Sequence, residues 1–158
     1  MVRESLARRF KPAGFEQPEG SRKDYTKPRD ELCDAFYRWM RELPEALDHM
    51  SAYVQYGKAR KLIEPLGEIP YMEANALLAG FKPKTKVESV AGIFISACYN
   101  KSSERVIIFD LDAPEIKCIG YNLGENRVLV NNGEVGDYFG SGSQGIAINN
   151  KKAKNLKI

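Results

Sequence analysis

Two neighbouring stretches, IGYNLGENRVLVNNGE at residues 119–134 and VGDYFGSGSQGIAINNKK at residues 135–152, form a near-repeat in the C-terminal third of the chain. Each has a β-branched residue before a glycine (Gly120, Gly136), then an apolar residue before a second glycine, and then an apolar–x–apolar–Asn–Asn segment. Short alternating segments between glycine corners predict stacked β coils. An antiparallel hairpin with an Asn132-Gly133 turn is the alternative that these residues leave open.

The second unit resembles a known repeat. Its segment GDYFGSG at 136–142, followed by Gly145 and Ile148, is similar to the repeat of the GXGXG β-solenoid domain. That domain forms the C-terminal part of the glutamate synthase large subunit and a subunit of formylmethanofuran dehydrogenase. The likeness covers residues 119–150, and Gln144 stands where the family has the first glycine of a Gly-Gly pair. The family domain is a structural spacer, so the resemblance implies architecture and assembly and carries over no catalytic residue.

Helical patterning precedes these repeats. The apolar residues of the first predicted helix, which follows Pro28, recur at spacings of four, three and four: Leu32, Phe36, Trp39 and Leu43. A second helical face runs from Leu47 to Ile63, with a bend or break expected at Gly57, and a third helix is expected over Tyr71–Leu78. We therefore predict a three-helix lobe over residues 27–84, after an irregular basic arm over residues 1–26.

From about residue 85 the pattern changes. The segment VESVAGIFISACY at 87–99 alternates in a way that predicts a strand, and RVIIFDL at 105–111 predicts a second strand that closes a hairpin. Trp39 and Phe36 are expected to lie between the helical lobe and this sheet. The sequence thus predicts an α+β fold, in which the three-helix lobe packs on a C-terminal β-meander or short β-solenoid over residues 85–158. We expect one compact domain overall.

Three segments resemble catalytic or cofactor-binding motifs, but the residues around each of them do not fit that role. The GSGSQG segment at 140–145 matches GxGxxG, but no βαβ unit surrounds it, so Gly140, Gly142 and Gly145 are expected to form a backbone corner. Asp110 and Asp112 resemble the first motif of haloacid-dehalogenase-type phosphatases, but Pro114 stands where that motif has Thr or Val. His49 has no identifiable nucleophile to pair with. The sequence therefore predicts no catalytic residue, cofactor or metal.

The cysteines and the hydropathy indicate the compartment. Cys33, Cys98 and Cys118 are widely spaced and form no CxxC, which predicts reduced, unligated and mostly buried thiols in a cytoplasmic protein. No apolar run is long enough to cross a membrane, and Met1 to Phe15 lacks the apolar core of a secretory signal.

Charge adds two binding hypotheses. The net charge is +3, both ends of the chain are basic and the middle is acidic, so a nucleic-acid-associated protein that uses its basic ends is one alternative. A small-molecule-binding protein or an enzyme with a site between the two lobes is the other. The candidate binding patch, which could face a small molecule, a phosphate or a nucleic acid, combines tyrosines with charged residues: Tyr53, Tyr56, Lys58, Arg60, Asp110 and Arg127.

The leading functional hypothesis is a non-catalytic module that binds a protein partner or a second copy of itself. A sheet that stops at the last repeat leaves an unpaired edge. Leu156 and Ile158 alternate with Lys157 in the manner of a strand. We therefore expect a homo-oligomer, most simply a C2 dimer, with the tail or the last coil in its interface.

Overall fold

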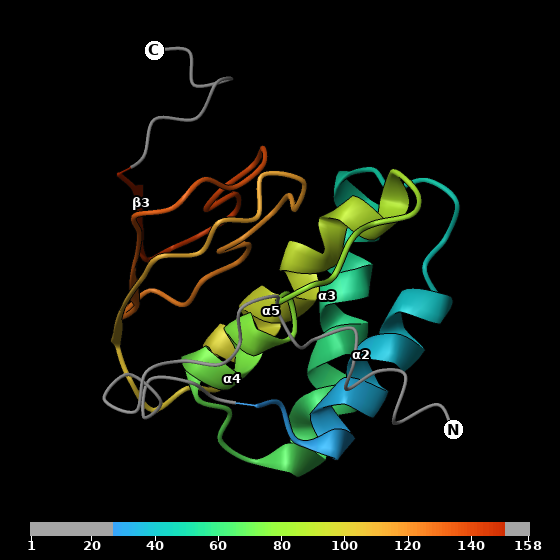
Figure 1. Ribbon diagram of the computed structural model, residues 1–158, viewed down its shortest axis with the longest axis horizontal. Helices are drawn as coiled ribbons and strands as arrows, with labels where there is room; N and C mark the ends of the chain where they lie inside the picture. Colours follow the sequence, from blue (N-terminus) through green and yellow to red (C-terminus); the bar gives the residue numbers. More distant parts are fainter. Residues whose placement is uncertain (1–26, 151–158) are drawn as a thin grey trace.

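The computed structural model describes residues 27–150, so the basic arm over residues 1–26 and the tail over residues 151–158 lie outside the described part (Figure 1). The helices are α2 (Asp30–Arg41), α3 (His49–Ile63), α4 (Tyr71–Ala76) and α5 (Gly92–Tyr99), with short 3-10 helices η2 (Glu64–Leu66) and η3 (Val87–Ala91). The strands are β1 (Val106–Phe109), β2 (Val128–Asn131) and β3 (Ile146–Asn149). The fold is α+β, as expected, and among residues 27–150 no helix is long and apolar enough to span a bilayer.

The predicted first helix is confirmed as α2. Its one apolar face buries Leu32, Phe36 and Trp39, and acidic residues occupy its first turn, where they complement the positive end of the helix dipole. Phe36 and Trp39 both pack on Phe94, with ring centroids 5.1 and 5.6 Å apart. The two aromatic residues are therefore buried as predicted, but the Phe94 that they contact belongs to a helix and not to a strand.

Helix α3 is continuous. Asp48 caps its amino end by accepting a hydrogen bond from the Ser51 amide at 2.8 Å, and the helix runs on to Ile63 without interruption. The break considered at Gly57 is absent, since this glycine lies within the helix. Helix α4 begins directly after Pro70, as predicted.

The strand predicted over residues 87–99 is wrong, because these residues form the 3-10 helix η3 and then α5, the central helix (Figure 1). All eight residues of α5 are buried, so the helix is covered on every side and shows no amphipathic period. The periodicity of a short apolar run of this kind does not distinguish a buried helix from a buried strand. The hairpin expected between residues 87–99 and β1 therefore does not exist.

Close packing explains why small residues begin α5. A Cβ added to Gly92 would lie 2.2 Å from the Lys117 carbonyl oxygen, so only glycine allows this approach. One turn further on, the Ser96 hydroxyl accepts hydrogen bonds from the amides of Gly120 and Tyr121 at 2.7 and 2.9 Å. It donates to the Gly92 carbonyl at 2.6 Å. These contacts fix the loop that joins β1 and β2 onto α5.

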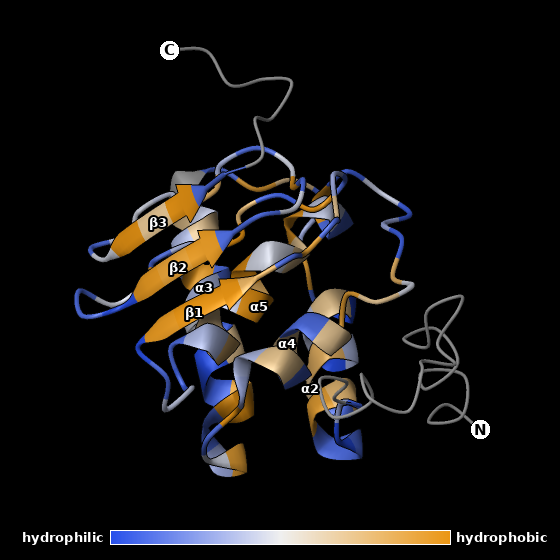
Figure 2. Ribbon diagram, turned by 60° about the vertical axis from the view of Figure 1, so that its left-hand side comes forward, coloured by the Kyte–Doolittle hydropathy of each residue, from blue (hydrophilic) through white to orange (hydrophobic). Residues whose placement is uncertain are grey.

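The strands form one parallel sheet in the order β1-β2-β3 (Figure 2). The pairing places Val106, Val128 and Ile146 side by side in neighbouring strands. Parallel pairing of β2 and β3 contradicts the hairpin alternative, which needs antiparallel strands. The loops between the strands also stack: the Gly140 amide donates to the Ile119 carbonyl at 2.8 Å, and the Gln144 amide to the Leu123 carbonyl at 3.0 Å.

The backbone conformation repeats in the two loops, but the corners that stack are not the ones that the sequence repeat aligns. Positive φ angles recur at Cys118, Gly120 and Asn122 in one loop, and at Tyr138, Gly140 and Gly142 in the next. The sequence aligned Gly120 with Gly136, whereas in the structure it is Gly140 that stacks beside Gly120. The paired asparagines also stack: Asn131 lies beside Asn149, and the Asn150 side-chain amide donates to Asn132 Oδ1 at 2.7 Å.

One buried core joins the helices to the inner face of the sheet. It extends from Trp39 of α2 through Phe94 of α5 to Ile107 and Leu129, which are fully buried beneath the strands. The opposite face of the sheet has no such cover within residues 27–150.

Candidate functional site

The outer face of the sheet is apolar and exposed (Figure 2). Its side chains form two rows across the three strands, Val106–Val128–Ile146 and Ile108–Val130–Ile148. The exposed fractions are 55% for Val106, 55% for Ile108, 56% for Ile146 and 44% for Ile148. An apolar sheet face with exposed side chains from all three strands side by side is a candidate interaction surface. We call these six residues the outer-face patch.

Polar side chains border the outer-face patch at the carboxyl ends of the strands. Asp110, Asn132 and Asn150 each directly follow one of the strands, and all three are exposed. A flat apolar centre with a polar rim is the composition of a protein–protein interface.

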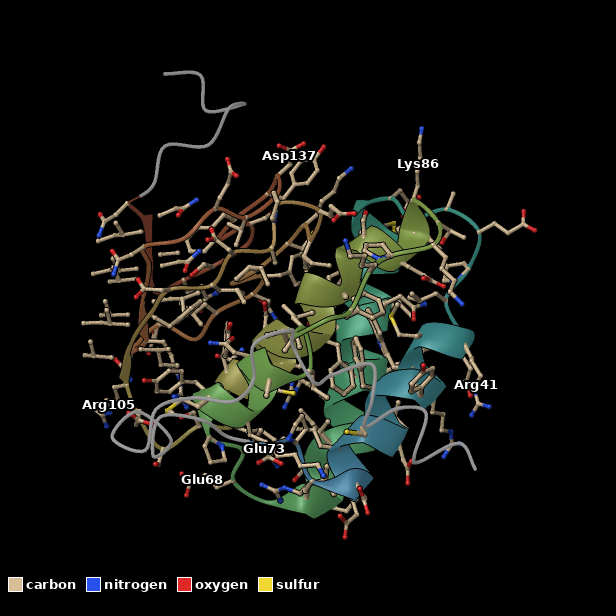
Figure 3. All side chains as sticks on the ribbon, in the orientation of Figure 1. Arg41, Glu68, Glu73, Lys86, Arg105 and Asp137 are labelled. Atoms are coloured by element: carbon tan, nitrogen blue, oxygen red, sulfur yellow. The ribbon has the colours of Figure 1, made fainter. Side chains whose placement is uncertain are left out.

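A second feature is a cleft of about 680 Å³ at the amino ends of the strands. One wall is α3, another is the end of α5, and the third is the pair of turns that precede β1 and β2. Most of its lining is polar or charged: Tyr56, Arg60, Glu64, Asn100, Lys101, Asn122, Glu125, Asn126, Gln144, Arg105 and Arg127. We call this feature the basic cleft. In Figure 3, Arg105 lies at the outer edge of the molecule, whereas Glu73 lies between the helices.

Asn100 organises the basic cleft. Its amide nitrogen donates to the Tyr56 hydroxyl at 2.7 Å and to the Asn122 carbonyl at 3.1 Å, and its Oδ1 accepts from the Gly124 amide at 2.9 Å. One side chain thereby ties α3 and the β1–β2 loop to the end of α5. Tyr56 is buried, and its ring packs against Tyr121 at 5.8 Å.

Two of the cations in the basic cleft, Arg127 and Lys101, have fixed partners. The Arg127 guanidinium donates to the carbonyls of Glu104 and Asn100 at 2.6 and 3.0 Å. Burial lowers the pKa of Arg127, and the nearby positive charge of Arg105 lowers it further. The Lys101 ammonium lies 3.6 Å from the Glu64 carboxylate and pairs with it.

The structure brings together half of the predicted binding patch. Tyr56, Arg60 and Arg127 line the basic cleft. Tyr53 and Lys58 are exposed on α3 outside this lining. Asp110 follows β1 at the carboxyl end of the strands, whereas the cleft lies at their amino ends, so its assignment to the same patch is wrong.

Sequence reasoning missed Asn100, Lys101 and Arg105 as cleft residues. A signal for Arg105 was present, because Arg105-Val106 and Arg127-Val128 echo each other at the starts of two strands that prove to be parallel neighbours. Asn100 and Lys101 stand in a segment that reads as a hairpin turn as long as residues 93–99 are taken for a strand. Their position at the end of a buried helix is what directs them into the cleft.

The cysteines and one partly buried ion pair lie outside the basic cleft and have structural roles. The three cysteines are free and buried, and burial raises the pKa of Cys33 and of Cys118 to about 11 each, so these thiols stay protonated at neutral pH. Arg29 and the buried Glu73 form an ion pair at 2.8 Å that ties the start of α2 to α4. Within residues 27–150, no group of three or more His, Cys, Asp or Glu side chains is arranged to hold a metal ion.

Comparisons with family models, with curated proteins and with solved structures found no match to this chain. The geometry of the outer-face patch and of the basic cleft is therefore the basis for the proposals below.

Proposed function

We propose that the chain is a non-catalytic interaction module that self-associates, with the outer-face patch of one copy packed against that of a second copy. The observation that carries this proposal is the double row of six β-branched side chains on an uncovered sheet face. Ile107 and Leu129, on the other face of the same strands, are fully buried, so the exposure is specific to the outer face.

A second copy fits this surface because both partners then offer the same apolar sheet face to each other. Two sheets pack face to face about 10 Å apart when the side chains of both inner faces are apolar and interdigitate. A two-fold axis in the plane of such an interface places the same residues on both sides. The polar residues that follow the strands, Asp110, Asn132 and Asn150, then lie at the rim, where they keep their contact with water.

The size of the patch sets the strength of association. Three strands about 4.8 Å apart, each four residues long at about 3.3 Å per residue, cover roughly 190 Å². A stable interface buries about 800 Å² per partner. The patch alone therefore supports a weak dimer that forms and dissociates with concentration, and not an obligate one.

The resemblance of residues 119–150 to the GXGXG β-solenoid domain supports a role in assembly. The parallel strands and their stacked loops are what a short solenoid of this kind would have. In that family the domain is a structural spacer within a larger enzyme, which fits a chain whose most prominent surface is an apolar sheet face.

Sedimentation velocity from about 10 µM to about 1 mM tests the proposal. The average mass should rise with concentration from the monomer value of 17.8 kDa, and Ile108→Lys or Val130→Lys should hold it there. The matched control is Val54→Lys, which places the same charge on α3 at a residue that is 53% exposed, close to the 55% of Ile108. A wild-type mass that stays monomeric over the whole range overturns the proposal, as does an equal effect of Val54→Lys.

Removal of residues 151–158 separates two modes of association. Pairing through the last strand and the tail predicts that this truncation lowers the average mass. Association through the outer-face patch predicts that the truncated chain still associates and that Ile108→Lys abolishes association in it. If the truncation abolished association and Ile108→Lys did not, the contact would be the edge of the sheet and not its outer face.

A further inference from the structure

The basic cleft holds positive charge that carboxylates do not cancel. Arg60, Lys101, Arg105 and Arg127 line it together with two acids, Glu64 and Glu125. Lys101 is paired with Glu64. Within residues 27–150, no ion pair joins Arg60, Arg105 or Arg127 to a carboxylate. Three guanidinium groups therefore line one cleft without an ion pair to either of its two acids.

Arg127 is the most constrained of these groups. Its guanidinium is half-buried, and the two backbone carbonyls that accept its hydrogen bonds fix its position without neutralising its charge. A partly buried cation beside a second cation, Arg105, is costly unless an anion compensates it. The local backbone thus holds Arg127 in place at an electrostatic cost that a bound anion would offset.

A neutral donor faces the same space. The Tyr56 hydroxyl accepts a hydrogen bond from Asn100 and lines the cleft, while the tyrosine as a whole is only 5% exposed. No acceptor for its own proton is found within residues 27–150. Asn100 is held by three hydrogen bonds, so the hydroxyl oxygen is fixed in position before any ligand arrives.

We propose that the basic cleft binds a phosphate-bearing small molecule, with the phosphate oxygens contacted by Arg60, Arg105 and Arg127 and by the Tyr56 hydroxyl. Guanidinium groups match the geometry of phosphate oxygens, because each offers two parallel N–H donors. The volume of about 680 Å³ lies in the range of small-molecule sites, roughly 300–1,000 Å³.

The same lining argues against a nucleic acid as the ligand. A protein that follows a nucleic-acid backbone uses a continuous positively charged groove, with aromatic rings exposed for stacking. Here Glu64 and Glu125 interrupt the basic lining, and the ring of Tyr56 is buried against Tyr121. The cleft therefore suits a compact anion better than a long polyanion.

Titration with inorganic pyrophosphate at constant ionic strength tests the proposal, with isothermal calorimetry as the readout. Saturable binding is expected, and Arg60→Gln and Arg105→Gln should each weaken it about tenfold, the effect of losing one charged hydrogen bond. Both side chains are exposed, so both variants should fold. The matched control is Lys58→Gln, which removes one charge from the same helix outside the cleft and should change affinity less than about twofold.

Three outcomes overturn the proposal. The first is the absence of saturable pyrophosphate binding at millimolar concentration, and the second is an equal loss of affinity in Lys58→Gln and Arg60→Gln. The third is loss of pyrophosphate binding on removal of residues 151–158, which would place the ion on the lysines of the tail. Tight binding of a short single-stranded RNA together with no binding of pyrophosphate would favour the nucleic-acid alternative instead. Ile108→Lys should bind pyrophosphate normally, which keeps this test independent of self-association.

Discussion

Helix α5 and the three-stranded sheet are both rich in β-branched and other apolar residues, yet the structure uses them differently. Every residue of α5 is buried, whereas the strands bury only one of their two faces. The difference shows that apolar content alone does not identify a core: α5 lies within the core of the monomer, while the outer apolar face of the sheet lies outside it. We expect substitutions around α5 to unfold the protein, and substitutions on the outer face of the sheet to change its association.

The largest effect is expected for Trp39→Ala. Trp39 is 1% exposed, packs on Phe94 of α5, and donates a hydrogen bond from Nε1 to the Gln55 carbonyl at 2.9 Å. Removal of a buried tryptophan leaves a cavity and costs about 3–5 kcal/mol. Urea unfolding followed by circular dichroism measures it. Met50→Ala, at a residue that is 80% exposed, should change the free energy of unfolding by less than about 0.5 kcal/mol, and a similar loss in both variants would contradict the assignment of the core to α5.

The next effect separates two helical glycines. A Cβ at position 92 would meet the Lys117 backbone, which has no rotamer by which to escape, so Gly92→Ala should destabilise by about 3 kcal/mol, the upper range for overpacking. Gly57→Ala on α3 meets no atom within 4 Å and should stabilise the protein by about 0.5–1 kcal/mol. The two variants should thus move the unfolding midpoint in urea in opposite directions. If Gly92→Ala were neutral, α5 would not lie against the β1–β2 loop as described.

Periodicity determined how much of this fold was predictable. Helix α2 has one apolar face and a polar remainder, and the sequence predicted it. Helix α5 is surrounded by α3, α4 and the loops of the sheet, so burial on all sides removed the helical period from its sequence. The near-repeat predicted β2 and β3, but the choice between stacked coils and a hairpin depended on long-range pairing that local sequence does not encode.

The candidate sites were predictable to a similar degree. Tyr56 and Arg60 lie one helical turn apart on α3, and local spacing was enough to group them. Arg105 and Arg127 join them because β1 and β2 are parallel, which places the residues before both strands at the same end of the sheet. The strand direction also explains why the inclusion of Asp110 was wrong. Asp110 follows its strand, so it lies at the opposite end of the parallel sheet from the residues that precede the strands.

A smaller effect concerns the thiol of Cys118, which lies in the loop packed against α5. Burial raises its pKa from 9.0 to about 11. Because the pKa is higher in the folded than in the unfolded chain, the protonated thiol contributes stability that is fully present below pH 9. This stability is lost progressively as the pH rises from 9 toward 11. At pH 10 the loss is about 1 kcal/mol.

Chemical denaturation at pH 8 and pH 10 measures this loss for Cys118. The wild type should lose about 1 kcal/mol more than Cys118→Ala between the two pH values, because the other titrating groups are common to both chains and cancel in the difference. Equal losses in the two proteins would mean that the Cys118 thiol is in contact with water in the folded state.

The smallest effect on stability is expected on the outer face of the sheet. Two neighbours in a single strand show the same contrast between a buried and an exposed apolar side chain. Ile107 and Ile108 are neighbours in β1, but Ile107 is fully buried and Ile108 is 55% exposed. Ile108→Thr keeps the β-branched shape and should change the free energy of monomer unfolding by less than about 0.5 kcal/mol. Ile107→Thr places a hydroxyl in the core beneath the sheet and should cost about 2 kcal/mol or more. Urea unfolding at low protein concentration, where the proposed dimer is dissociated, compares the two. A loss in Ile108→Thr as large as that in Ile107→Thr would show that the outer face is covered in the folded monomer, and the surface proposed for self-association would then not be available.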